Sequence, residues 1–295
     1  MFIKFFSQTK YFTQHEYVGY SFRSLLVWKI ATFRRFFNHE RKFLRLRYIL
    51  RLLNTWKMKN TKSGPALIAA TGKSLLMIPD EILKEFTNKE SLFGVNLYIL
   101  SEKGKKFPPT YQIIADREGW IKVDKGNFHE FQTNGQELIN LKKIKYVIQP
   151  NYFENCFENQ NTIYIHKNPL SEISRSIGIC APSGLPNLTT FFAIATAIHL
   201  GYSPVYVAGL DLDHFRYLSF DGTSTLLNHH AYQENEDDLK WANRETTVKV
   251  LNSSLYPMQA LVKFKKHKVV IVGENSLIDV LPKISIDKLR HSLET

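Results

Sequence analysis

The chain has 295 residues, and its 39 Lys and Arg against 27 Asp and Glu give a formal net charge of +12. Residues 1–62 hold 14 basic and 2 acidic residues and account for the whole excess, whereas residues 63–295 hold 25 of each kind. This distribution disfavours a nucleic-acid-binding fold, which needs excess cations to neutralise phosphates, and 44% hydrophobic residues exclude a wholly disordered chain.

The N-terminal segment, residues 1–62, is predicted to form two basic amphipathic helices. The apolar positions of the first follow one helical stripe, at Phe22, Leu26, Ile30, Phe33 and Phe37. Those of the second are Leu46, Ile49, Leu53 and Trp56. Basic amphipathic helices bind anionic membrane surfaces, so we expect peripheral attachment here. The alternatives are a helical hairpin packed on the main domain or on another subunit, and RNA binding.

Residues 63–295 are predicted to form one domain of alternating strands and helices. Strands are expected at residues 65–70, 92–96, 111–116, 145–149, 162–166, 204–211 and 268–272. Helices are expected near residues 79–86 and 187–200, and within residues 228–267. This alternation predicts an α/β fold, a modified Rossmann-like sandwich with a mostly parallel sheet and helices on both faces.

The turn Thr71-Gly72-Lys73-Ser74 follows the first predicted strand. It ends like a P-loop, but the required earlier glycine is replaced by Leu67, which disfavours that motif. A turn at the carboxyl end of a strand is suited to receive a nucleotide phosphate or ribose. A plain connection between strand and helix is the alternative.

Asp211 and Asp213 follow the predicted strand at residues 204–211. An Asp-x-Asp pair at a strand end is the pattern by which many sugar-nucleotide transferases hold a divalent cation. Asp211 has two competing roles that need no metal: a hydrogen bond to substrate, or support of the neighbouring loop.

The pair His229-His230 is the best candidate for a general base. Imidazole has the pKa best suited to take a proton from a sugar hydroxyl near neutrality. A structural or surface role is the alternative, and neither histidine has zinc-site spacing. Ser183-Gly184, before the predicted helix at 187–200, indicates a second phosphate- or sugar-binding helix terminus.

Cysteine content and hydropathy indicate the compartment. The two cysteines, Cys156 and Cys180, have no CxxC or zinc-ligand spacing, which disfavours a disulfide scaffold and favours a reducing environment. No run of 18 apolar residues occurs, so we expect no membrane span. The expected location is cytoplasmic, on the inner face of the cytoplasmic membrane.

The order of these motifs carries a family resemblance. Thr71-Gly72-Lys73-Ser74-Leu75 is followed by Ser183-Gly184, Leu200-Gly201-Tyr202, the run from Val205 to Asp211, and Asn275-Ser276-Leu277. Over about residues 64–285 the chain resembles the bacterial sialyltransferases of glycosyltransferase family 42 and their relatives, the flagellin-modifying Maf proteins and the MptE-like family.

The resemblance implies a CMP-activated nonulosonic donor sugar and no metal. It would place Gly72 and Ser74 at the donor phosphate and ribose, and Asn96 and Asp116 at the donor sugar or phosphate. Absence of metal is chemically reasonable, because a CMP leaving group carries one phosphate rather than a diphosphate.

The remaining implied roles belong to later motifs. Ser183 and Gly184 would contact the donor carboxylate or cytidine, and Asp211 the nucleotide. His230 would deprotonate the acceptor hydroxyl, with His229 as the second choice.

This chain departs from the family pattern at three places. Lys73 stands where the family usually has proline, and Cys180 where the sialyltransferases have arginine. The loop after Asp211 offers Arg216 and Tyr217 instead of two tyrosines. The donor sugar is therefore expected to be sialic-acid-like or Kdo-like.

These features predict an inverting glycosyltransferase that acts on a surface glycan or glycolipid, as in lipopolysaccharide or capsule biosynthesis. One alternative is an MptE-like diphosphokinase that uses ATP and Mg²⁺ through Asp211 and Asp213. Another is a non-catalytic, membrane-associated glycan-assembly protein. The sequence leaves a homo-oligomer open.

Overall fold

A computed structural model describes most of the domain predicted at residues 63–295 and the helix before it. The described residues are 46–115, 144–151, 161–167, 176–181, 185–186, 188–212, 247–274 and 276–294. Within them eight strands form one sheet in the order β5-β4-β3-β2-β1-β6-β7-β8, and every neighbouring pair is parallel. The predicted Rossmann-like α/β architecture is confirmed.

Seven strands lie where the sequence predicts them. They are β1 (Ala66–Ala69), β2 (Leu92–Val95), β3 (Tyr111–Ile113), β4 (Tyr146–Pro150), β5 (Asn161–Ile165), β6 (Val205–Ala208) and β7 (Val269–Val272). The sequence missed β8 (Lys283–Ile284), because two residues are too few to show a periodic pattern.

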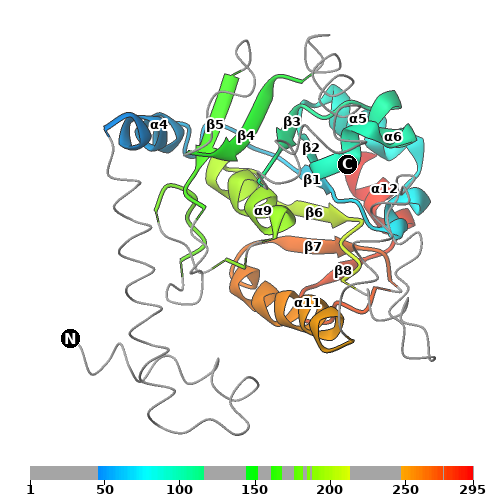
Figure 1. Cartoon of the computed structure of the whole chain (residues 1–295). Helices are drawn as coiled ribbons and strands as arrows, with labels where there is room; N and C mark the ends of the chain where they lie inside the picture. The colour runs from blue at the N-terminus through cyan, green and yellow to red at the C-terminus, as the bar shows by residue number, and fades with distance from the viewer. Residues whose placement is uncertain are drawn as a thin grey trace, which may run out of the picture.

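Helices cover both faces of the sheet (Figure 1). One face carries α9 (Thr189–Leu200), α11 (Thr247–Ala260) and the 3-10 turn η5 (Leu261–Phe264). The other carries η2 (Lys73–Met77), α5 (Asp80–Asn88), η3 (Asn96–Leu100) and α12 (Ile286–Glu294). The short helix α6 (Glu102–Lys106) follows η3 directly.

Alternation along the central strands divides the core into two layers. In β1, Ile68 faces the α9 layer, whereas Leu67 faces the α5 layer. In β6, Val207 and Tyr206 divide in the same way. Because both faces are covered, these strands are apolar throughout, as buried parallel strands are.

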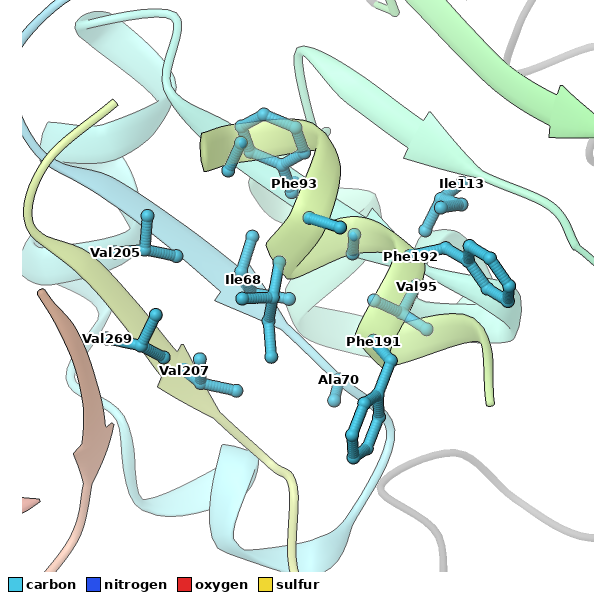
Figure 2. Close-up of a cluster of buried hydrophobic side chains, with 14 of the residues drawn as sticks. Ile68, Ala70, Phe93, Val95, Ile113, Phe191, Phe192, Val205, Val207 and Val269 are labelled. Carbon is cyan, nitrogen blue, oxygen red and sulfur yellow. The ribbon is translucent and has the colours of Figure 1, made fainter. Parts of the chain in front are cut away.

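Helix α9 is the main partner of the sheet. Ten of its twelve residues are buried, and Phe191 and Phe192 lie over side chains of the central strands, as Figure 2 shows. Full burial of one such large apolar side chain contributes roughly 1.5–3 kcal/mol. Gly201 ends the helix in the left-handed conformation, with φ of 106°, which a side chain rarely adopts.

The second predicted N-terminal helix is present as α4 (Leu46–Lys57), and it packs against the edge strand β5. Thr55 is buried, and its hydroxyl oxygen accepts a hydrogen bond from the backbone N–H of Tyr164 at 2.9 Å. Arg51 donates to the carbonyl of Asn151 at 2.8 Å, and its guanidinium lies over the Tyr164 ring. The helix therefore supplies hydrogen-bond partners to backbone groups at the edge of the sheet.

The apolar stripe of α4 does not face the sheet. Leu46 is 71% exposed and Trp56 is 59% exposed, and Ile49, Leu50 and Leu53 are also exposed. The helix docks through the Thr55 side instead. The first predicted helix lies outside the described residues, and the domain boundary at residue 62 stays a prediction. Of the helices described, none is long and apolar enough to cross a membrane.

Replacing Thr55 with Val should destabilise the fold by about 1–3 kcal/mol. Valine preserves the shape of threonine but leaves the N–H of Tyr164 without its acceptor. Chemical denaturation measures the change. Thr61→Val is the matched control, because the Thr61 hydroxyl is exposed. Equal stability of the Thr55 variant and the wild type would contradict the proposed role of this bond.

Candidate functional site at the switch point of the sheet

The strand order reverses between β1 and β6. From β1 the chain proceeds through β2, β3, β4 and β5 on one side, and then returns to β6 on the other side of β1. In open parallel sheets, ligands bind outside the carboxyl ends of the strands where the order reverses in this way. The turn at residues 71–74 follows β1, and Asp211 follows β6, so both lie at this point.

Gly72 sits where the two connections touch. Its N–H donates to the carbonyl of Gly209 at 2.8 Å. A Cβ on Gly72 would lie 2.5 Å from the Asp211 carboxylate and 2.6 Å from the Gly209 carbonyl, closer than atoms can approach. Gly209 itself has φ of 72°, in the left-handed region that favours glycine. Both glycines are therefore required by close approach of the two turns.

The Asp211 carboxylate holds the turn after β1. The backbone N–H of Ser74 donates to one carboxylate oxygen at 3.0 Å, and the Ser74 hydroxyl donates to the other. Ser74 belongs to the first turn of η2, so the negative charge lies at a helix N-terminus, where it is stabilised. Support of the neighbouring loop, one of the alternatives for Asp211, is thus what the geometry displays.

In this arrangement, the hydrogen-bond donors that the sequence analysis assigned to a ligand phosphate already have partners within the protein. The Gly72 N–H is bonded to Gly209, and the N–H and hydroxyl of Ser74 are bonded to Asp211. A ligand here would contact the outer surface of the turn, including the exposed Lys73. The assignment of Gly72 and Ser74 to the donor phosphate and ribose stays a prediction.

Asn96 lies one strand further along the same edge. It directly follows β2 and has φ of 48°. Its carbonyl accepts a hydrogen bond from Nε2 of Gln112 at 2.8 Å. The Gln112 side-chain oxygen is buried and has no hydrogen-bond partner among the described residues. The Gln112 side chain therefore fixes the backbone of Asn96 from within the sheet.

Sequence reasoning missed a second group of buried polar residues, at the carboxyl ends of β4 and β5. Asn151 is fully buried, and neither polar atom of its side-chain amide has a partner in the described parts of the chain. Lys167 is also buried, and its ammonium donates to the carbonyl of Ala115 at 2.6 Å. The sequence signal that could have identified these residues is that they directly follow apolar strands.

His166 is the third member of this group. Burial lowers its pKa to about 4, so the imidazole is neutral at physiological pH. The pKa of His166 in the folded protein lies below the ordinary value of 6.5. Its contribution to the free energy of unfolding is therefore fully present above pH 6.5 and is lost as the pH falls toward 4. A neutral histidine beside buried Asn151 adds hydrogen-bonding capacity without charge.

The other predicted site residues lie outside the described residues. They are Asp116, Ser183, Gly184, Arg216, Tyr217, His229 and His230. Asp213 is also outside them. The structure therefore brings together Gly72, Ser74 and Asp211, and places Asn96 on the same edge. Within the described ranges, no group of three or more His, Cys, Asp or Glu residues is arranged to hold a metal ion.

The parallel sheet, the helices on both faces and the reversal of strand order between β1 and β6 define a Rossmann-like α/β protein. No protein-family model matches the chain. A search of curated protein sequences also gives no match.

Among solved structures, the chain is similar to the Maf glycosyltransferase from Magnetospirillum magneticum AMB-1. The identity is 14%, the TM-score is 0.44, and the match covers 85% of this chain. The match spans 42% of the length of that protein. A similarity with this identity and TM-score is too weak to support the fold assignment. That assignment rests on the sheet topology of this chain.

Replacing Gly72 with Ala should destabilise the protein by about 1–3 kcal/mol, because the new methyl group would overlap the Gly209 carbonyl and the Asp211 carboxylate. Thermal and chemical denaturation measure the change. Gly178→Ala is the control, since within the described parts of the chain a Cβ there would meet only the Ser176 hydroxyl, at 3.1 Å. Wild-type stability of the Gly72 variant would show that the two turns do not touch as described.

Proposed function

We propose that this protein is an inverting glycosyltransferase that uses a nucleotide-activated sugar donor. The observation that carries the proposal is the switch point between β1 and β6, where the turn after β1 is hydrogen-bonded to Asp211 after β6. Nucleotides bind to Rossmann-like sheets at such a point. The motif order described above adds the resemblance to glycosyltransferase family 42 and the Maf proteins.

The proposed donor is a CMP-activated acidic sugar of the sialic-acid or Kdo type. In the reaction, the acceptor oxygen bonds to the anomeric carbon while the bond from that carbon to the CMP phosphate oxygen breaks. The acceptor proton passes to the imidazole of His230, or of His229 as the second choice. Arg216 and Tyr217 would stabilise the departing phosphate.

No metal is required by this proposal. The leaving group carries a single phosphate, whose charge one cation and a few hydrogen-bond donors can balance. Asp211 has both carboxylate oxygens engaged by Ser74, which favours a structural role for this residue over metal coordination. Asp213, the other carboxylate of the pair, lies outside the described residues.

A nucleotide panel tests the proposed donor class. CMP, CDP, UDP, GDP and ATP are each added with and without Mg²⁺, and thermal stability is recorded. CMP should stabilise the protein by about 2.7 kcal/mol at 100 times its Kd, without a requirement for Mg²⁺. Asp211→Asn should weaken this effect, since an amide nitrogen cannot accept from Ser74, whereas exposed Asp287→Asn should not.

Turnover provides the second arm of this test. His230→Ala should abolish sugar transfer while leaving CMP binding nearly unchanged, and His291→Ala should behave as the wild type. Full activity of the His230 variant would reject this residue as the base. The absence of any nucleotide binding would instead favour the non-catalytic glycan-assembly protein.

The diphosphokinase is the enzymatic alternative. It requires ATP and Mg²⁺ at Asp211 and Asp213, so its activity would be lost on addition of EDTA. Transfer from a CMP-sugar would continue in EDTA. Stabilisation by ATP with Mg²⁺ but not by CMP would therefore support this alternative.

The proposed acceptor is a surface glycan or glycolipid, reached from an anionic membrane surface through residues 1–62. The support is the exposed apolar stripe of α4, defined as Leu46, Ile49, Leu50, Leu53 and Trp56. It lies in a segment that carries the whole +12 charge of the chain. Exposed aromatic and aliphatic side chains with nearby basic residues suit the interface of an anionic bilayer.

Substitutions within this stripe test the membrane contact without removing α4, which the sheet edge needs. The triple variant Leu46→Gln, Ile49→Gln, Leu53→Gln should reduce binding to vesicles containing phosphatidylglycerol by tenfold or more in a sedimentation assay. The matched control replaces Leu255, Val262 and Leu277, which are exposed elsewhere, with Gln. Equal vesicle binding by both triple variants would refute this surface as the contact.

A further inference from the structure

A cavity lies at the end of the sheet opposite the switch point. Its volume is about 740 Å³, within the range of small-molecule sites. Val205 at the start of β6 and Lys268 just before β7 line it, so it opens at the amino ends of these strands. Since β6 has four residues, the two sites are separated by about 13 Å along the strand.

The walls of the cavity are mostly apolar. They come from the segment at residues 176–181, from the C-terminal half of α9 and from the end of α4. The apolar side chains that line the cavity include Trp56, Ile177, Ile179, Ala195, Ile198 and Val205. These side chains offer a hydrocarbon chain an environment with little polar competition.

Three lysines give the cavity its charge. Lys59, Lys266 and Lys268 line it, together with His199 and His267. Among the described residues, no carboxylate lines the cavity, and none of the three lysines forms an ion pair. Burial lowers the pKa values of both histidines, so the lysines supply the positive charge. An anionic group is the ligand that complements this lining.

The wall on the α9 side is held by backbone bonds. The N–H of Asn60 donates to the carbonyl of His199 at 3.0 Å, and that of Lys62 donates to Leu200 at 2.8 Å. A Cβ at Gly201 would lie 2.4 Å from the Lys62 carbonyl, so the segment after α4 packs directly on the end of α9. This wall of the cavity is therefore fixed by the fold.

We propose that this cavity binds an anionic amphiphile, a molecule with one phosphate or carboxylate head and a hydrocarbon chain. The lysines receive the head, and the apolar wall receives the chain. Trp56 lies both in the cavity and in the exposed apolar stripe of α4, so a chain can pass from one surface to the other. This site is separate from the proposed transfer reaction and does not depend on it.

Dodecyl phosphate below its micelle concentration is the probe, used with the full-length protein. Calorimetry measures its Kd against two references, inorganic phosphate for the head alone and dodecyl maltoside for the chain alone. The expected result is binding at least tenfold tighter than either reference. Equal binding of phosphate would overturn the role of the chain, and equal binding of the maltoside would overturn the role of the charge.

Alkylation of Cys180 locates the bound molecule. This thiol is a lining residue, and burial raises its pKa to about 11, so little of it is thiolate near neutral pH and its alkylation is slow enough to follow. Dodecyl phosphate should slow its modification at least threefold, as followed by peptide mass spectrometry with and without ligand. Tight binding without protection of Cys180 would place the molecule elsewhere and overturn the proposal.

Two variants separate charge from shape. Lys59→Gln, Lys266→Gln, Lys268→Gln should weaken dodecyl phosphate binding at least tenfold. The control triple at the exposed residues Lys84, Lys105 and Lys288 removes the same charge elsewhere and should not. Ala181→Trp places a large side chain at the exposed lining position Ala181 and should weaken binding with all lysines kept. Unchanged affinity in both cavity variants would overturn the proposal.

Discussion

The tie between Asp211 and the turn after β1 is the constraint on which the rest of the candidate site depends. β1 and β6 are adjacent in the sheet, yet their paired residues lie 139 positions apart in the sequence, as Ile68 and Val207 do. Their connections leave the sheet side by side and are joined by a backbone hydrogen bond from Gly72 to Gly209. The carboxylate of Asp211 joins them through two hydrogen bonds to Ser74. A loop held in this way presents a fixed surface to any ligand that binds at the switch point.

The glycines around this tie show how packing and charge act together. Gly72 and Gly209 bring the two backbones into contact, and only then does the carboxylate reach the N–H of Ser74. The negative charge is placed at the start of η2, where backbone N–H groups point toward it. The positions of these four residues are thus mutually dependent.

Much of the fold could be predicted from the sequence, because buried parallel strands are short apolar runs that end at polar residues. The runs that became β1 and β6 are clear examples, and α9 was recognised by its nearly continuous apolar character. Strand β8 could not be found, since its two residues carry no pattern. The sequence also did not show which side of α4 packs on the sheet, because its apolar stripe is exposed and a buried threonine contacts β5.

The candidate site was predictable only in part. Polar residues after strands pointed to Ser74 and Asp211, but their mutual hydrogen bonds depend on strand order, which local periodicity does not encode. Asn151 and His166 follow strands in the same way, and no motif distinguishes them from ordinary loop residues. Burial is what makes them noteworthy, and burial is a property of the assembled sheet.

The contact between α4 and β5 has a consequence for the behaviour of the folded chain in concentrated solution. β5 is the last strand on its side of the described sheet, and its residues Thr162, Ile163 and Ile165 are β-branched. An uncovered strand of this kind is a template for pairing with another molecule. Because the Thr55 hydroxyl accepts the hydrogen bond of the Tyr164 N–H, α4 covers this part of the edge strand and hinders its pairing with another molecule.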